Sequence, residues 1–85
     1  MANTLNTAKK AESMLSSTAD TMGFEIADIE FVKEGQNYYL RVYLDKEGGI
    51  TIDDCESFSR AAEKILDEND IIEQAYIFEV SSPGL

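Results

Sequence analysis

The sequence contains no histidine and no tryptophan, and it has one cysteine and one proline among 85 residues. Without histidine, neither a Ser-His-Asp triad nor a Cys-His pair can be completed within the chain. The single Cys55 excludes an internal disulfide and a cysteine-type zinc site, and such cysteine usage is typical of a reducing, cytoplasmic setting. No apolar core like that of a signal peptide follows Met1, and no apolar run approaches the roughly 20 residues of a membrane-spanning helix.

Basic residues are also scarce, because seven Lys and Arg stand against 17 Asp and Glu, for a formal net charge of −10. Phosphate backbones are bound by clustered Lys and Arg, whereas the bases of this chain are scattered along it. General binding of nucleic acid is therefore disfavoured. A basic protein partner is the natural complement of such a charge. The alternative, that the charge only keeps the protein in solution, stays open.

The apolar periodicity predicts one small α+β domain. Residues 4–22 and 52–66 repeat as amphipathic helices do, while residues 25–32, 38–45 and 75–80 alternate as strands do. The predicted order is α-β-β-α-β, with a three-stranded sheet and both helices packed on one of its faces. A hydrophobic content of 44% is enough for such a two-layer core.

The alternation also predicts which side chains share a face of the sheet. The first strand is expected to carry Ala27, Ile29 and Phe31 on one face, with Asp28 and Glu30 on the other. The second strand follows antiparallel across a hairpin turn. The sequence leaves the order of the strands in the sheet open.

The last residues, Ser81-Ser82-Pro83-Gly84-Leu85, break the third strand, since proline and glycine mark a turn or a linker. We expect residues 1–82 to form a single domain. Residues 83–85 are then the start of a linker to a second domain that is absent from this chain.

A short segment joins the second strand to the second helix. Gly48-Gly49 permits a tight reversal, because glycine adopts positive φ without strain. Thr51 is placed to cap the helix by accepting a hydrogen bond from the amide of Asp54. Ile50 and Cys55 have the spacing of a hydrophobic staple, so Cys55 is expected to pack and not to act as a nucleophile.

Other chemistry at this segment has weak support. Asp45, Asp53 and Asp54 could gather around Mg²⁺ or Ca²⁺, but their spacing does not match a calcium-binding loop. Gly48-Gly49 is a poor phosphate loop, because no Lys-Ser/Thr follows it and the neighbouring acids would repel phosphate. We expect no catalytic residue, no metal and no cofactor.

One arrangement could contact nucleic acid. Tyr39, Arg41 and Tyr43 fall on the side of the second strand that faces away from the helices, where aromatic rings could stack on bases. Ordinary sheet packing explains the same pattern equally without nucleic acid.

Six stretches, in order along nearly the whole chain, carry a family likeness: Gly23-Phe24-Glu25, Asp28-Ile29-Glu30-Phe31-Val32-Lys33-Glu34-Gly35, Leu40-Arg41-Val42-Tyr43-Leu44-Asp45, Gly48-Gly49-Ile50-Thr51-Ile52-Asp53-Asp54-Cys55, Ser59-Arg60 and Glu79-Val80-Ser81-Ser82-Pro83-Gly84-Leu85. Through them the sequence resembles the N-terminal domain of the bacterial ribosome maturation factor RimP. The fourth and the last stretch are the most specific.

The resemblance implies a non-catalytic, cytoplasmic factor that assists assembly of the small (30S) ribosomal subunit. It implies an α-β-β-α-β first domain, which in this family is followed by a second, barrel-like domain. It also implies engagement of a basic small-subunit ribosomal protein near the decoding region, which agrees with the net charge of −10.

The leading hypothesis is therefore an assembly factor that binds a basic ribosomal protein through an acidic surface. The candidate contact residues lie at the turn, on the second helix and at the chain exit: Asp45, Asp53, Asp54, Glu56, Arg60, Ser81, Ser82, Pro83 and Gly84. The alternative is direct binding of small-subunit ribosomal RNA through Tyr39, Arg41 and Tyr43 on the exposed sheet face.

Overall fold

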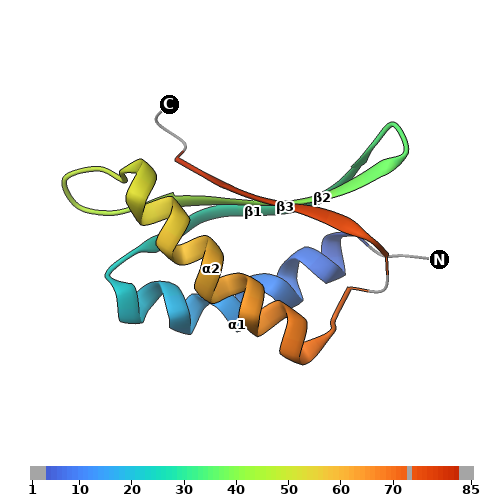
Figure 1. Ribbon diagram of the computed structural model, residues 1–85, viewed down its shortest axis with the longest axis horizontal. Helices are drawn as coiled ribbons and strands as arrows, with labels where there is room; N and C mark the ends of the chain where they lie inside the picture. The colour runs from blue at the N-terminus through green and yellow to red at the C-terminus, as the bar shows by residue number, and fades with distance from the viewer. Residues whose placement is uncertain (1–3, 73, 83–85) are drawn as a thin grey trace.

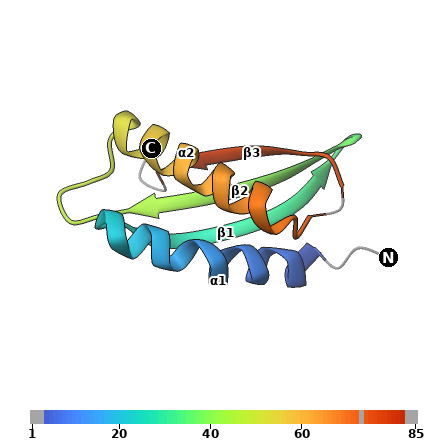
Figure 2. The ribbon, with the colours of Figure 1, turned by 60° about the horizontal axis from the view of Figure 1, so that its bottom comes forward.

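The computed structural model describes residues 4–72 and 74–82 of the chain. Five elements follow one another: α1 (Thr4–Met22), β1 (Glu25–Glu34), β2 (Asn37–Asp45), α2 (Ile52–Asn69) and β3 (Tyr76–Ser81). Figures 1 and 2 show both helices on the same face of a three-stranded sheet. The predicted α+β class and the α-β-β-α-β order are confirmed.

The sheet has the order β1-β2-β3, so the hairpin partner β2 is its central strand. β1 and β2 pair antiparallel, whereas β2 and β3 pair parallel. Parallel neighbours need a crossover connection, and α2 supplies it. β1 and β3 are the two edge strands of the sheet.

The core lies between the sheet and the two helices and consists of two buried clusters. The first cluster contains Leu15, Ala19, Phe24, Val42, Leu44, Phe58 and Ala62. The second cluster contains Ala8, Ala11, Phe31, Leu40, Leu66 and Ile72. The central strand contributes to both, and its three inward side chains are fully buried, as period-two alternation predicts.

Local sequence sets the end of α1. Gly23 has a φ of 82°, which only glycine adopts readily. The amide of Gly23 donates to the carbonyl of Asp20 and the amide of Phe24 donates to the carbonyl of Ala19, at 3.1 and 2.8 Å. This is a Schellman ending, and it turns the buried Phe24 ring back onto the core.

Among the described residues, no helix combines the length and the apolar character that crossing a membrane would require.

The prediction for the start of β1 was wrong at Ala27. The pairing of β1 with β2 shifts between Ile26 and Asp28, so Ala27 is the extra residue of a β-bulge and its side chain is exposed. Because the bulge reverses the alternation on its N-terminal side, Ile26 packs against the first cluster instead. The placement of Ile29 and Phe31 on the core side is confirmed.

Substitutions at Ile26 and Ala27 test which of the two side chains packs against the core. Ile26→Ala is expected to lower the free energy of unfolding by roughly 1–2 kcal/mol, below the ~2–5 kcal/mol range of fully buried residues because Ile26 is only partly buried. Ala27→Ser should change it by less than ~0.5 kcal/mol. Urea unfolding followed by circular dichroism measures both, and the opposite ranking would show that the strand alternates without a bulge.

Candidate functional site

The segment of residues 45–56, called here the acidic turn, has the local structure that its sequence predicts. Gly48 and Gly49 have φ values of 89° and 97°, and the amide of Gly49 donates to the carbonyl of Lys46 at 2.9 Å. The side-chain oxygen of Thr51 accepts a hydrogen bond from the amide of Asp54 at 3.1 Å. The carboxylate of Asp54 accepts one from the amide of Thr51 at 3.0 Å. The capping prediction is confirmed, and the reciprocal bonds form a complete capping box.

Asp54 is also the partner of a cation. Its carboxylate lies 2.7 Å from Nζ of Lys46. The hydrogen bond from Lys46, and then the bond from the Thr51 amide, hold the pKa of Asp54 below its ordinary value of 3.8. A lowered pKa means that Asp54 stabilises the fold above pH 3.8, and that this contribution is lost as the pH falls through the lowered pKa. The carboxylate of Asp54 is therefore engaged in contacts that stabilise the turn.

The helix cap gives a second test. Thr51→Ala should lower the free energy of unfolding by ~0.5–2 kcal/mol, because the amide of Asp54 loses its acceptor. Thr51→Ser keeps a hydroxyl at the same position and should retain most of the stability. Equal midpoints of urea unfolding for the alanine variant and the unmodified chain would contradict a stabilising cap.

The remaining acids of the segment are turned to solvent. Asp45 accepts a hydrogen bond from the amide of its neighbour Lys46 at 2.8 Å, and its side chain is exposed. Asp53 lies in the first turn of α2, where the helix dipole favours an acid. Glu56 pairs with Arg60 at 2.7 Å, but both side chains are well exposed, so the pair adds little stability.

The fold brings the acidic turn next to the end of β3. Val80, Ser81 and Ser82 line a cavity of about 320 Å³ together with turn and helix residues, namely Ile50, Thr51, Ile52 and Cys55. Two candidate stretches that lie far apart in the sequence are thus neighbours. Pro83 and Gly84, the other candidates at the chain exit, lie outside the described residues.

Cys55 is partly exposed in this cavity. Partial burial, and then the negative charge of Asp54, raise the pKa of its thiol. A raised pKa lowers the thiolate fraction at neutral pH, so Cys55 is not activated as a nucleophile. It shares the cavity wall with Ile50, and the predicted staple between the two side chains stays a prediction.

The candidate RNA-binding residues lie on the open face of the sheet, around Arg41. The guanidinium contacts carboxylates from both neighbouring strands, Glu34 at 2.7 Å and Glu79 at 2.8 Å, with Glu30 at 3.6 Å. It also lies 4.7 Å from the centroid of the Tyr39 ring. Arg41 thus connects all three strands through side chains, a role that the sequence did not reveal because strand order was open.

This network shifts the titration of its members. The hydrogen bond and the charge of Arg41 hold the pKa of Glu34 below its ordinary value. The hydroxyl of Tyr43 donates to Glu30 at 3.1 Å, and this bond, followed by burial, raises the pKa of Tyr43. The positive charge of Arg41 is therefore balanced within the sheet.

Within residues 4–72 and 74–82, no three His, Cys, Asp or Glu side chains gather as they would to hold a metal ion. In particular, Asp54 faces Lys46, so the paired aspartates of the turn do not form a cation site with Asp45.

A sequence model of the family described as the RimP N-terminal domain matches residues 14–85, which is well over half of the chain. The family is one of ribosome maturation factors and is not a known enzyme family. The match confirms the likeness drawn from the sequence. The chain therefore belongs to the RimP N-terminal domain family, a family of ribosome maturation factors.

Proposed function

We propose that this domain assists assembly of the small (30S) ribosomal subunit in the cytoplasm by binding a basic small-subunit ribosomal protein through an acidic surface. The domain would act by binding alone, with no bond made or broken. Complementary charge contributes to such an interaction mainly through the rate of association and the choice of partner.

The observation that carries the proposal is the unequal pairing of charges. The cations Arg41, Lys46 and Arg60 are held in ion pairs with acids of the same domain. Asp45 and Asp53 are exposed and form no ion pair within the described parts of the chain. The surplus of negative charge is thus available to a partner at the acidic turn, whereas the nearby cations Lys46 and Arg60 are already paired.

Direct binding of ribosomal RNA through Tyr39, Arg41 and Tyr43 has less support. A phosphate approaching Arg41 would meet the carboxylates of Glu34 and Glu79, which already contact the guanidinium. Titration with small-subunit ribosomal RNA fragments tests this alternative. Affinity that is lost in Arg41→Ala and unaffected by changes at the acidic turn would favour it.

The proposal is tested by measuring association of this chain with purified basic small-subunit ribosomal proteins at about 50 and 300 mM salt. We expect binding that weakens at the higher salt concentration, because the Debye length shortens below ~10 Å above 0.1 M. No binding at either concentration, with intact folding shown by circular dichroism, would refute the proposal for this domain.

A matched pair of variants locates the contact. Asp53→Asn removes one charge from the acidic turn, and Glu12→Gln removes one charge from an exposed position on α1. The first should slow association more than the second. Equal effects would mean that net charge matters and the acidic turn does not.

A further inference from the structure

β3 is an edge strand with a free side. It pairs only with β2, and among the described residues no element pairs with its other edge. A free edge presents backbone N–H and C=O groups to which another extended chain can pair. α2 packs along the same strand, as Figure 2 shows. Two cavities are lined by residues of both elements, and together they are called here the α2–β3 groove.

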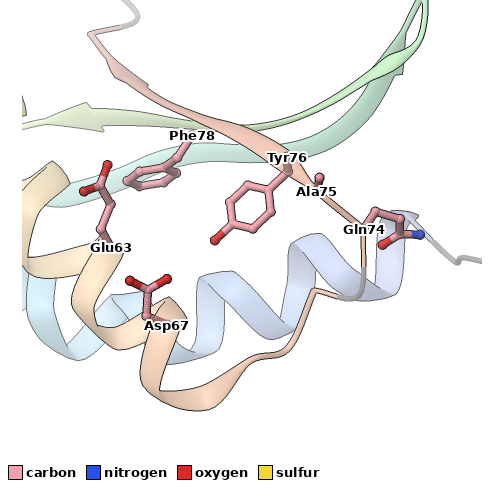
Figure 3. A pocket seen from close by; sticks show the side chains of 6 residues that line it. All are labelled: Glu63, Asp67, Gln74, Ala75, Tyr76 and Phe78. Carbon is pink, nitrogen blue, oxygen red and sulfur yellow. The ribbon is translucent and has the colours of Figure 1, made fainter.

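One end of this groove is an acidic cavity with aromatic walls. It has a volume of about 420 Å³ and is lined by Glu63, Asp67, Gln74, Ala75, Tyr76 and Phe78. Figure 3 shows the two carboxylates on α2 facing the two rings on β3. The lining contains no cation, and neither carboxylate forms an ion pair within the part of the chain that the structure describes.

These walls suit a lysine or arginine side chain. Its aliphatic stem can lie along the rings of Tyr76 and Phe78 while its charge reaches the carboxylates, and the ring faces attract the same charge. Partial burial, followed by the negative charges of Asp67, Glu63 and Asp70, raises the pKa of Tyr76. The direction of that shift agrees with a negative potential in the cavity.

The other end of the groove is apolar. The cavity of about 320 Å³ at the end of β3 is lined mainly by apolar side chains, including Ile50, Ile52 and Val80. Ile52 is 82% exposed, more than any other large hydrophobic residue of the described chain. This end suits an apolar side chain of a partner.

We infer that the α2–β3 groove binds an extended, basic segment of a partner protein, which adds to the free edge of β3 as a further strand. A basic side chain of that segment enters the cavity at Glu63 and Asp67, and an apolar side chain enters the cavity at Ile52 and Val80. The inference rests on the proposed function and names the form in which the basic ribosomal protein is recognised.

The spacing of the two cavities sets the pattern of the segment. Tyr76 and Phe78 line the first cavity, and Val80 to Ser82 line the second. Within β3, Tyr76 at the first cavity and Val80 at the second lie four residues apart on the same face of the strand, or about 13 Å at ~3.3 Å per residue. Since alternate residues of a strand share a face, the basic and the apolar residue should be four positions apart.

Charge complementarity selects this occupant. A second copy of the chain would bring a further net charge of −10 to an acidic groove. A nucleic acid would place phosphates against Glu63 and Asp67. A basic extended segment satisfies both the carboxylates and the free backbone groups.

The test uses the whole chain labelled with ¹⁵N and two kinds of probe. One is the basic ribosomal protein that binds in the association assay. The other is a nine-residue peptide, rich in Thr and Val, with one Lys and one Leu four positions apart. A control peptide of the same composition separates them by three positions, which places them on opposite faces of a strand.

With both probes we expect chemical-shift changes at β3 and at the groove side of α2. Glu63→Gln/Asp67→Asn should weaken binding by at least roughly fivefold, as expected for loss of partly desolvated contacts to a cation. Glu12→Gln/Asp20→Asn, which removes the same charge from exposed positions of α1, should have a smaller effect. N-methylation of alternate peptide amides on the paired side should abolish binding.

The outcomes separate the inference from the proposed function. Binding of the ribosomal protein with no shift change at β3 or around Glu63 and Asp67 overturns the inference and leaves the proposed function standing. Binding of the peptide with Lys and Leu four positions apart, without binding of any ribosomal protein, supports the groove as a binding site. The same result refutes the proposal that a ribosomal protein supplies the segment. Equal binding of both peptides, or a concentration-dependent dimer that occupies the groove, overturns the inference, as does binding of neither probe.

Discussion

Replacing Phe58 by alanine should lower the free energy of unfolding by ~3–5 kcal/mol, as large-to-small changes of buried phenylalanine do. The ring is fully buried, and it is the largest fully buried side chain of the described residues. It belongs to the cluster in which Leu15 of α1 and Val42 and Leu44 of β2 also lie. Deleting the ring leaves a cavity where both helices and the sheet meet.

The size of this loss matters because domains of this length have a small free energy of unfolding. Native stabilities are typically ~5–15 kcal/mol, and an 85-residue domain belongs toward the lower end. A fraction of Phe58→Ala molecules should therefore be unfolded at 25 °C. Urea unfolding followed by far-ultraviolet circular dichroism measures the change.

Two control variants are compared with Phe58→Ala in the same measurement. Ser57→Ala changes the exposed neighbouring position and should stay within ~0.5 kcal/mol of the unmodified chain. Phe58→Leu keeps most of the apolar volume and should lose less than Phe58→Ala. A loss below ~1 kcal/mol for the alanine variant would mean that the ring does not fill the core.

The parts of the fold that depend on near neighbours could be predicted from the sequence. The burial of Leu40, Val42 and Leu44 follows from period-two alternation within one strand, and it is observed. The cap of α2 could be predicted because Thr51 and Asp54 are three residues apart. Both features are set by residues within one element or at its end.

The parts that depend on which elements become neighbours could not be predicted. Arg41 and Glu79 are 38 positions apart in the sequence, and their contact exists because β3 pairs parallel with β2. The bulge at Ala27 is a break in a pattern that otherwise reads as regular alternation. Neither the contact between Arg41 and Glu79 nor the bulge can be predicted from local periodicity.

The groove was missed for the same reason, although a signal was present. Glu63 and Asp67 are four residues apart and so share one face of α2. Tyr76 and Phe78 share the core side of β3. Only the packing of α2 along β3 brings the two pairs together, and that packing is tertiary.

The N-terminal half of α1 is expected to be essential for stability. The family match begins at residue 14, yet Ala8 and Ala11 precede it and are buried in the second cluster. A chain reduced to residues 14–85 would expose parts of Phe31 and Leu40, which pack in that cluster. Each large apolar side chain that loses its burial costs ~1.5–3 kcal/mol, so the free energy of unfolding should fall by on the order of 3 kcal/mol.

A point variant separates loss of packing from loss of helix length. Ala11 is fully buried, so Ala11→Asp places a carboxylate among apolar side chains without a partner, at a cost of on the order of 3 kcal/mol or more. Ser13→Asp adds the same charge two residues away, at an exposed position, and should be nearly neutral. If the shortened chain and Ala11→Asp both unfold at the urea concentration of the unmodified chain, α1 is not part of the core before residue 14. If only Ala11→Asp is destabilised, the early turns of α1 are tolerated but not required. The expected result, destabilisation of both with Ser13→Asp unchanged, would place the second cluster under α1 and extend the folded unit beyond the residues that the family match covers.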